Sequence, residues 1–271
     1  MTKLSIKQFR TIIWDHYNAS KREFAWRTTS DPYHILVSEI MLQQTQTHRV
    51  APKYDAFLKR FPNFSNLAQA PLADVLCMWQ GLGYNRRAKS LHNACKEIVT
   101  KYNGIFPHEP EELIALPGIG PYTAHAVCTF AFNKPHVFIE TNIRTVFIHF
   151  FFQKKDKISD KELMPFIKEA LDSSNPREWY YALMDYGVLL KSHMINPSRK
   201  SKHHAVQSKF EGSDRQIRGA IIRLLTESVA ISYETIIMNI NKEEERVKKI
   251  LYQLCKEEMI IKQSNIFRLP H

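Results

Sequence analysis

The sequence predicts an all-α fold, and three observations lead to this prediction. Apolar residues recur at three- and four-residue steps along most of the chain. Few segments alternate apolar and polar residues with the period of two that strands require. Hydrophobic residues make up 44% and charged residues 24% of the 271 residues, as in ordinary globular proteins, which excludes wholesale disorder and fibrous repeats. The length predicts about two domains.

Two helices in the first 190 residues carry clear start signals. Pro110 is followed by two glutamates, and both proline and acidic residues favour the first turn of a helix. Ser159 and Glu162 have the spacing of a capping box, and Ile158 and Leu163 are placed as a hydrophobic staple around it. We therefore expect helices to begin at these two positions.

The chain is predicted to have three parts: a domain over 1–190, a basic linker over 191–211 and a small domain over 212–271. Within the linker, residues 191–204 contain basic and small polar residues and no acid, which suits either a solvated loop or a contact with phosphates. In the last part, the sequence pattern predicts helices over 217–227 and 233–239. A third helix is predicted to be capped by Asn241, with Glu244 at its third position. A hairpin turning at Ser264 and Asn265 follows. This arrangement resembles a winged-helix module, which serves either DNA contact or protein docking.

The charge of the chain points to a polyanionic partner. Lys and Arg number 38 against 27 Asp and Glu, a formal net charge of +11, so nucleic acid is the first partner to consider. The first seven residues lack the apolar stretch of a signal peptide, and no run approaches about 18 apolar residues. We expect neither secretion nor a membrane span, and we expect a cytoplasmic (bacterial nucleoid) or nuclear location.

The cysteines and histidines give no support for a metal site. The chain has four cysteines, scattered singly without a CxxC pair: Cys77, Cys95, Cys128 and Cys255. This distribution fits a reducing compartment and argues against disulfides, a zinc ribbon or a cysteine-ligated iron–sulfur cluster. The histidines clustered over 193–204 lack a spaced set of partner ligands.

The most specific local motif is LPGIGPYTA at residues 116–124. Gly118 and Gly120 allow a sharp turn with accessible backbone N–H groups, ahead of a helix whose positive dipole end attracts phosphate. An ordinary turn between two helices is the alternative. The full string favours a phosphate-binding helix-hairpin-helix motif.

Two further segments accompany this motif, DPYHILVSEIMLQQTQT at 31–47 and WQGLGYNRRAKSL at 79–91. Together the three resemble the adenine DNA glycosylases of the MutY type, within the helix-hairpin-helix glycosylase superfamily. The resemblance runs from Phe24 to Leu189. It implies a two-lobed glycosylase fold and a DNA-repair enzyme that removes a damaged or mispaired base from double-stranded DNA, and we expect a monomer.

An enzyme of this kind must flip its target nucleotide out of the duplex and fill the hole that is left. On the resemblance, Leu42, Gln44 and Tyr84 match the wedge positions, where an amide pairs with the widowed base and a ring or apolar group replaces stacking. Helix core is an equal alternative for Leu42. The residues expected to contact DNA are Leu42, Gln43, Gln44, Thr45, Tyr84, Arg86, Arg87, Gly118, Gly120 and Thr123. For the basic face formed by Arg86, Arg87 and Lys89, a solvated surface is an equal alternative.

Cleavage of an N-glycosidic bond requires an acid for the leaving base and a negative charge near the sugar. On the resemblance, Glu39 matches the general acid, and its apolar neighbours favour a raised pKa. Glu140 stands where the family has aspartate, which moves the carboxylate by about 1.5 Å. Asn142 matches the family's neighbour of the sugar. Tyr122 stands where bifunctional members similar to endonuclease III have a lysine, so no Schiff base is expected and the enzyme should be monofunctional.

The chain departs from the resemblance in two places. After Gly187 the family continues into four cluster-binding cysteines, whereas residues 189–204 contain none, so an iron–sulfur cluster and any other cofactor are expected to be absent. The family's 8-oxoguanine-recognition domain is not recognisable either. Adenine opposite 8-oxoguanine or guanine is the first substrate to consider. The alternatives are another base lesion, or a non-catalytic protein that binds DNA lesions or structures.

Overall fold

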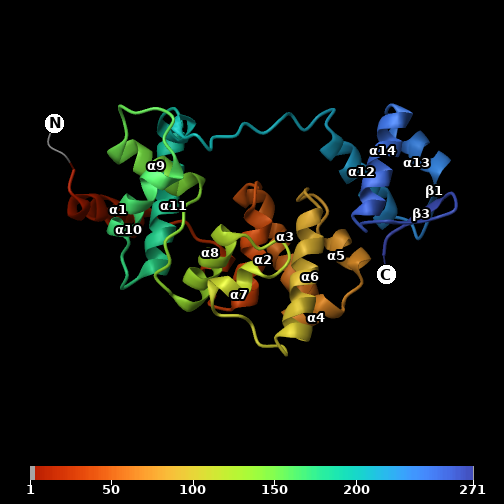
Figure 1. Cartoon of the computed structure of the whole chain (residues 1–271), viewed down its shortest axis with the longest axis horizontal. Helices are drawn as coiled ribbons and strands as arrows, with labels where there is room; N and C mark the ends of the chain where they lie inside the picture. The colour runs from red at the N-terminus through yellow and green to blue at the C-terminus, as the bar shows by residue number, and fades with distance from the viewer. Residues whose placement is uncertain (1–3, 271) are drawn as a thin grey trace. The chain divides into compact units, whose positions relative to one another are not determined.

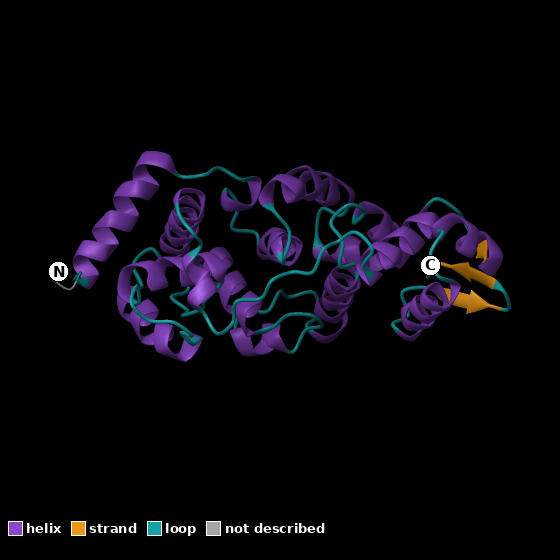
Figure 2. Ribbon diagram, turned by 90° about the horizontal axis from the view of Figure 1, so that it is seen from above, coloured by secondary structure: helices purple, strands orange, loops and turns teal. Residues whose placement is uncertain are grey.

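The computed structural model describes residues 4–270, and it confirms the all-α prediction (Figure 2). In this part of the chain, strands occur only near the C-terminus. Contacts divide the chain into two compact units, each assembled from separate segments. The first unit comprises Met1–Leu36, His108–Ile114 and Ile119–Val206, and the second comprises Val37–Pro107, Ala115–Gly118 and Gln207–His271. Among the residues described, no helix is long and apolar enough to cross a membrane.

The first unit is helical, and Figure 1 labels its α-helices. Its elements are α1 (Ile6–Ser20), η1 (Ala25–Arg27), the first half of α2 (Pro32–Leu42), α7 (Pro110–Ile114), α8 (Pro121–Phe132), α9 (Thr141–Phe151), α10 (Asp160–Ala170), α11 (Pro176–His193) and η2 (Pro197–Lys200). The predicted starts at Pro110 and after Ser159 are both confirmed, and the capping box of Ser159 and Glu162 is formed.

Helices α9 and α11 form the centre of the first unit. Phe147 of α9 and Trp179 of α11 are fully buried, and Phe9 of α1 packs against both, with ring centroids 5.1 and 6.1 Å away. Burying aromatic rings of this size is a large hydrophobic contribution and fixes the three helices against one another.

A buried carboxylate on α11 anchors the segment that follows α1. The side chain of Asp185 is 1% exposed and accepts hydrogen bonds from Arg22 Nε at 2.6 Å and from Arg27 Nη2 at 2.8 Å. Burial alone raises the pKa of this carboxyl, but the hydrogen bonds and charges of the two arginines outweigh burial and hold its pKa below the ordinary value. Asp185 and its two arginines therefore fix α11 against the segment that follows α1. Helix α11 carries part of the site described below.

The second unit contains two groups of elements. The first group is the second half of α2, α3 (Thr47–Arg60), α4 (Phe64–Gln69), α5 (Leu72–Met78) and α6 (Arg86–Lys101). The second group is α12 (Asp214–Thr226), β1 (Ile231–Ser232), α13 (Tyr233–Ile240), α14 (Glu244–Lys256), β2 (Ile261–Gln263) and β3 (Ile266–Arg268). Helices α4 and α5 pack on α6, and α12 packs on α5.

The elements from α12 onward, which we call the C-terminal module (residues 212–270), have the predicted winged-helix-like arrangement. The predicted hairpin is confirmed, with Ser264 in the left-handed conformation at its turn. A two-residue strand, β1, was not predicted because it is too short to show a period, and it gives the sheet the order β1-β3-β2. The apolar face of α14 is buried as its spacing predicts: Val247, Ile250, Leu251 and Leu254.

One predicted helix cap in the C-terminal module is wrong. Asn241 ends α13 in the left-handed conformation, with φ of 47°, and does not begin α14. The residue before α14 is Glu243, whose side chain makes no capping hydrogen bond. Asn suits both helix ends, because its short amide tolerates the left-handed conformation as well as N-capping, so its identity alone does not decide between them.

The stretch predicted as a linker, 191–211, has structure in its first half. Helix α11 continues to His193, and Ser201 forms a parallel bridge with Ile158, where the N–H of Lys202 donates to the carbonyl of Ile158 at 2.8 Å. Residues 205–209 form no helix or strand. The predicted domain boundaries of 1–190, 191–211 and 212–271 thus differ from the grouping by contacts, in which residues 37–107 and 207–271 belong together.

Candidate active site and nucleic-acid interface

Glu39 lies near the end of α2 and is only 7% exposed. The helix begins after Asp31, whose carboxylate accepts the backbone N–H groups of Tyr33 at 2.8 Å and His34 at 3.1 Å. Ile40 beside Glu39 is 2% exposed. A carboxyl group buried at this depth is shielded from bulk water, and a carboxyl group is one of the side chains that can serve as a general acid.

Two of the three predicted wedge residues, Gln44 and Tyr84, stand in unusual backbone conformations in the second unit. Gln44 has φ of 54° and is exposed, and Tyr84 has φ of 50°. Non-glycine residues adopt this left-handed region at an energetic cost, and such residues cluster at functional sites. Leu42 is half-buried at the end of α2, between the core and the loop.

Arg87 organises the loops that carry these two residues. Its guanidinium donates to the carbonyls of Ile40 at 2.9 Å and Gly83 at 3.1 Å and to the hydroxyl of Thr45 at 3.1 Å, and it also bonds the Gln43 carbonyl. Burial lowers the pKa of Arg87 to about 10. Arg87 was predicted to face phosphates or solvent, and instead it joins the end of α2 to the loop before α6.

The other two residues of the predicted basic face form ion pairs with the C-terminal module. Arg86 Nε donates to Glu257 Oε2 at 2.8 Å, and Lys89 Nζ lies 2.8 Å from Glu258 Oε2. Contacts between residues so distant in the sequence left no local signal, which is why sequence reasoning placed these side chains in solvent or on phosphate.

The glycine motif forms the expected turn between α7 and α8. Gly118 has φ of 74°, and a Cβ atom there would lie 2.4 Å from the Cβ of Ser90, so any side chain meets both strain and a clash. Gly120 precedes α8. Because glycine has no side chain, it provides no side-chain acceptor for the first backbone N–H groups of α8. Thr123 is 3% exposed, and the Tyr122 ring packs edge-on against Phe138 with centroids 5.7 Å apart.

Glu140 is fixed at the start of α9 in the first unit. Its Oε1 accepts the backbone N–H of Ile143 at 2.8 Å, and its Oε2 accepts Asn142 Nδ2 at 3.1 Å. Burial raises the pKa of the Glu140 carboxyl, while these hydrogen bonds and the charges of Lys191 and Arg144 oppose the rise without cancelling it. Asn142 Oδ1 is buried and has no hydrogen-bond partner among the described residues.

Sequence reasoning missed two residues of α11 that complete this region. Gly187 lies directly against Asn142, where a Cβ atom would come 2.6 Å from its backbone oxygen. Lys191 follows one turn later, so it lies on the same face of α11. Burial lowers the pKa of its ammonium and the charge of Glu140 opposes that effect. In the sequence, Lys191 could have been found from its position four residues after Gly187, because residues with this spacing lie on the same face of a helix.

Replacing Gly187 by Ala is expected to destabilise the protein by about 1–3 kcal/mol, because the atoms in the way belong to the backbone and Cβ of Asn142 and cannot rotate aside. Urea unfolding of the purified variant measures the change. Gly219→Ala is the matched control, since Gly219 is also helical and a Cβ there meets nothing within 4 Å. Equal stability of the two variants would contradict the close approach.

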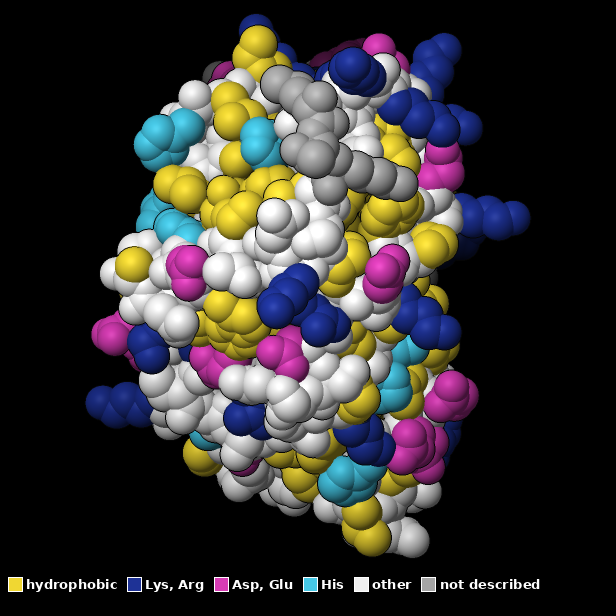
Figure 3. All heavy atoms as spheres, turned by 90° about the vertical axis from the view of Figure 1, so that its left-hand side faces the viewer, with side chains coloured by type: hydrophobic (Ala, Val, Ile, Leu, Met, Phe, Trp, Pro, Cys, Tyr) yellow, Lys and Arg dark blue, Asp and Glu magenta, His cyan; other side chains and the backbone are white. Residues whose placement is uncertain are grey.

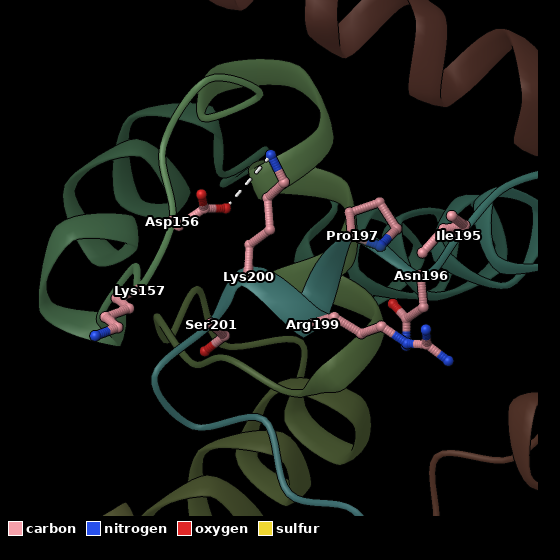
Figure 4. A pocket seen from close by; sticks show the side chains of 8 residues that line it. All are labelled: Asp156, Lys157, Ile195, Asn196, Pro197, Arg199, Lys200 and Ser201. Carbon is pink, nitrogen blue, oxygen red and sulfur yellow. Dashed lines mark ion pairs between the residues drawn. The ribbon is translucent and has the colours of Figure 1, made fainter.

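A separate pocket of about 510 Å³ in the first unit lies where the bridge to Ile158 forms (Figure 4). Asp156 and Lys200 face each other across it at 3.6 Å, and Lys157 and Arg199 lie on its rim. Within residues 4–270, no group of three or more His, Cys, Asp or Glu side chains is arranged to hold a metal ion. The pocket therefore offers no set of metal ligands.

The helical fold, the glycine turn, the buried Glu39 and the hydrogen-bonded carboxyl group of Glu140 point to one class of protein. The chain belongs to the HhH-GPD superfamily of base excision DNA repair proteins, whose family model matches residues 37–172. It is 32% identical to the adenine DNA glycosylase of Mycolicibacterium smegmatis, over 83% of this chain and 82% of that protein. It is 37% identical to the adenine DNA glycosylase of Buchnera aphidicola subsp. Baizongia pistaciae, over 67% of this chain.

The similarity is not uniform along these relatives. The chain spans about half the length of the Buchnera relatives, 52% of the one named above. Among solved structures, a thermostable thymine-DNA glycosylase is similar with a TM-score of 0.64 and 26% identity, over 72% of this chain and 91% of that chain.

Proposed function

We propose that this protein is a monofunctional DNA glycosylase that hydrolyses the N-glycosidic bond of a flipped base in double-stranded DNA. It acts as a monomer, in the bacterial nucleoid or in the nucleus. Adenine opposite 8-oxoguanine or guanine is the proposed substrate, as in the relatives named adenine DNA glycosylase. The observation that carries the proposal is the position of Glu39. It is buried in α2, and the loop that follows this helix carries Gln44 in the left-handed backbone conformation.

In the proposed reaction, Glu39 donates its proton to the leaving base while the bond between the base and C1′ of the sugar breaks. The bond electrons leave with the protonated base, and the sugar becomes oxocarbenium-like. The Glu140 carboxylate stabilises that positive charge. Water then adds to C1′ and gives its proton to a carboxylate, which leaves an abasic site. Gln44 and Tyr84 fill the space of the extrahelical nucleotide.

A second candidate substrate is a thymine or uracil in a mismatch. The thymine-DNA glycosylase structure supports it, because the present chain covers 91% of that chain at 26% identity. A thymine/uracil-DNA glycosylase that is 28% identical, and of which 85% is covered, supports it as well. The chemistry stays the same, since both substrates require a flipped base and cleavage at C1′.

Single-turnover base release from a panel of labelled duplexes tests the proposal and separates these substrates. The panel contains adenine opposite 8-oxoguanine, adenine opposite guanine, thymine and uracil opposite guanine, and an undamaged duplex. We expect strand cleavage only after alkali, at adenine. Release at a pyrimidine would favour the second candidate, and binding without any product would contradict both and favour a non-catalytic binder.

Borohydride treatment during turnover is expected to trap no protein–DNA adduct. Tyr122 provides no amine, so the sugar is attacked by water and no Schiff base forms. Gel electrophoresis of the denatured reaction checks this result. Lys191 is the amine coupled to Glu140, so an adduct that disappears in Lys191→Ala would overturn the monofunctional assignment and identify the nucleophile.

We also propose that the protein works without an iron–sulfur cluster. The residues do not fit one: residues 189–204 contain no cysteine, and Lys200 and Lys202 near the end of this stretch are hydrogen-bonded to Ile158 through their backbones. The iron content and visible absorption spectrum of the purified protein test this proposal.

A further inference from the structure

A basic groove of about 980 Å³ runs through the second unit between the wedge loops and α12. The wedge-loop side contributes Arg49, Lys53, Arg86 and Arg87, together with Gln44 and Tyr84. The α12 side contributes Arg215, Arg218 and Arg223. No aspartate or glutamate is among the described residues that line it. A concave surface with one sign of charge concentrates the opposite charge from solution.

Only part of this positive charge is neutralised by the protein. Arg86 and Arg218 share the carboxylate of Glu257, at 2.8 Å from Arg86 Nε to Oε2 and 3.1 Å from Arg218 Nη1 to Oε1. Burial raises the pKa of Glu257, but the hydrogen bonds from the two arginines outweigh it and hold the pKa at about 2. Within residues 4–270, the other five basic side chains of the groove have no carboxylate within 4.0 Å: Arg49, Lys53, Arg87, Arg215 and Arg223.

Aromatic rings lie in the same groove. Tyr84 is held by Arg215, whose Nη1 donates to the Tyr84 hydroxyl at 2.6 Å and whose guanidinium carbon is 5.3 Å from the ring centroid. Phe210 also lines the groove and is 59% exposed. Uncompensated arginines next to exposed rings are the combination that holds a nucleic-acid strand, with phosphates on the arginines and bases on the rings.

Another face of the molecule carries charged side chains of both signs, unlike the groove. In Figure 3, Lys and Arg side chains are interspersed with Asp and Glu side chains and with hydrophobic ones. Such a mixed surface gives no concentrated field, whereas the lining of the groove gathers charges of one sign.

We propose that the groove binds the sugar–phosphate backbone of the DNA and that the C-terminal module supplies part of this contact through Arg215 and Arg223 of α12. The inference rests on the proposed function and extends it, because it assigns DNA contact to the module and to its first helix. Of the two roles left open by the sequence, DNA contact and protein docking, the groove selects the first. Glu257 holds the module in place, and α12 completes the strand-binding surface beside Tyr84.

The test is duplex binding by fluorescence anisotropy at several salt concentrations, with the full chain and the double variant Arg215→Ala/Arg223→Ala. If each arginine neutralises one phosphate, the slope of log affinity against log salt falls by about 1.8, and affinity falls about tenfold or more. Arg223→Ala alone is expected to lower the slope by about 0.9. This single variant matters because Arg215 also holds Tyr84. The guanidinium of Arg223 makes no hydrogen bond or ion pair with the described residues, and its backbone carbonyl accepts a bond from the Thr226 hydroxyl.

Lys248→Ala/Lys249→Ala is the matched control. It removes the same charge from the same module, at exposed positions of α14 that do not line the groove, and it is expected to keep the slope, affinity and base release of the unaltered protein. A slope as steep in the groove variants as in this control overturns the proposal. Binding is measured without turnover, so a protein that binds with the predicted slopes but releases no base contradicts the proposed function and leaves the groove supported.

Discussion

Glu39→Gln is expected to slow base release about 10²–10⁴-fold while DNA affinity stays unchanged, because the amide keeps the shape of the side chain but has no proton of suitable acidity. Glu39 is 7% exposed, so a replacement of different size disturbs packing, whereas the amide has nearly the same size and shape. Single-turnover rates at saturating enzyme measure the chemical step, and anisotropy on the same duplex measures affinity.

Glu97→Gln is the matched control for this prediction. It removes the same charge from a partly exposed residue of α6, whose carboxylate pairs with Lys101 on the helix surface. We expect its rate and affinity to equal those of the unaltered protein. Unchanged base release by Glu39→Gln, with an unfolding midpoint equal to that of the control, would overturn the assignment of Glu39 as the acid.

Glu140→Gln is expected to slow base release about 10²–10³-fold, because it removes the negative charge proposed to stabilise the sugar cation. The unaltered protein should also show an acid limb in its pH–rate profile. Burial raises the pKa of Glu140, so the active carboxylate is lost as pH falls through a value above the ordinary 4.3 or so of glutamate. This limb should be missing from the profile of the variant.

Glu140→Asp separates the position of the carboxylate from its charge. Aspartate is a good N-cap and retains the charge, but its carboxylate is withdrawn by about 1.5 Å. A misplacement of about this size costs around a hundredfold in rate, so we expect a large decrease. A variant as fast as the unaltered protein would show that the observed position of Glu140, held by Ile143 and Asn142, is not required for the reaction.

The sequence predicted those features that depend on neighbouring residues. The capping box at Ser159 and the turn at Ser264 were correct, because each needs only a few adjacent side chains. The cap at Asn241 was wrong, because the same residue suits both ends of a helix and the choice depends on packing further away. The fold class followed from periodicity, which is also a local property.

The candidate site was only partly predictable for the same reason. The resemblance to a known family is what singled out Glu39, Gln44 and Glu140, whereas the roles of other residues depend on contacts between distant segments. Arg87 bonds carbonyls more than forty positions earlier, and Arg86 pairs with a residue 171 positions later. No local pattern records such partners, so side chains with a structural role were predicted to face phosphate or solvent.

The assembly of the second unit from two distant stretches has a consequence for how the protein forms during synthesis. The N–H of Ala73 donates to the carbonyl of Pro270 at 3.2 Å, and α12 packs on α5. These contacts cannot form until the ribosome has made the residues on both sides. Helices α5 and α6 therefore wait while the two later segments of the first unit, within residues 108–206, are translated. Long-range closure also makes folding slow, so this unit should be the last part of the newborn chain to become protease-resistant.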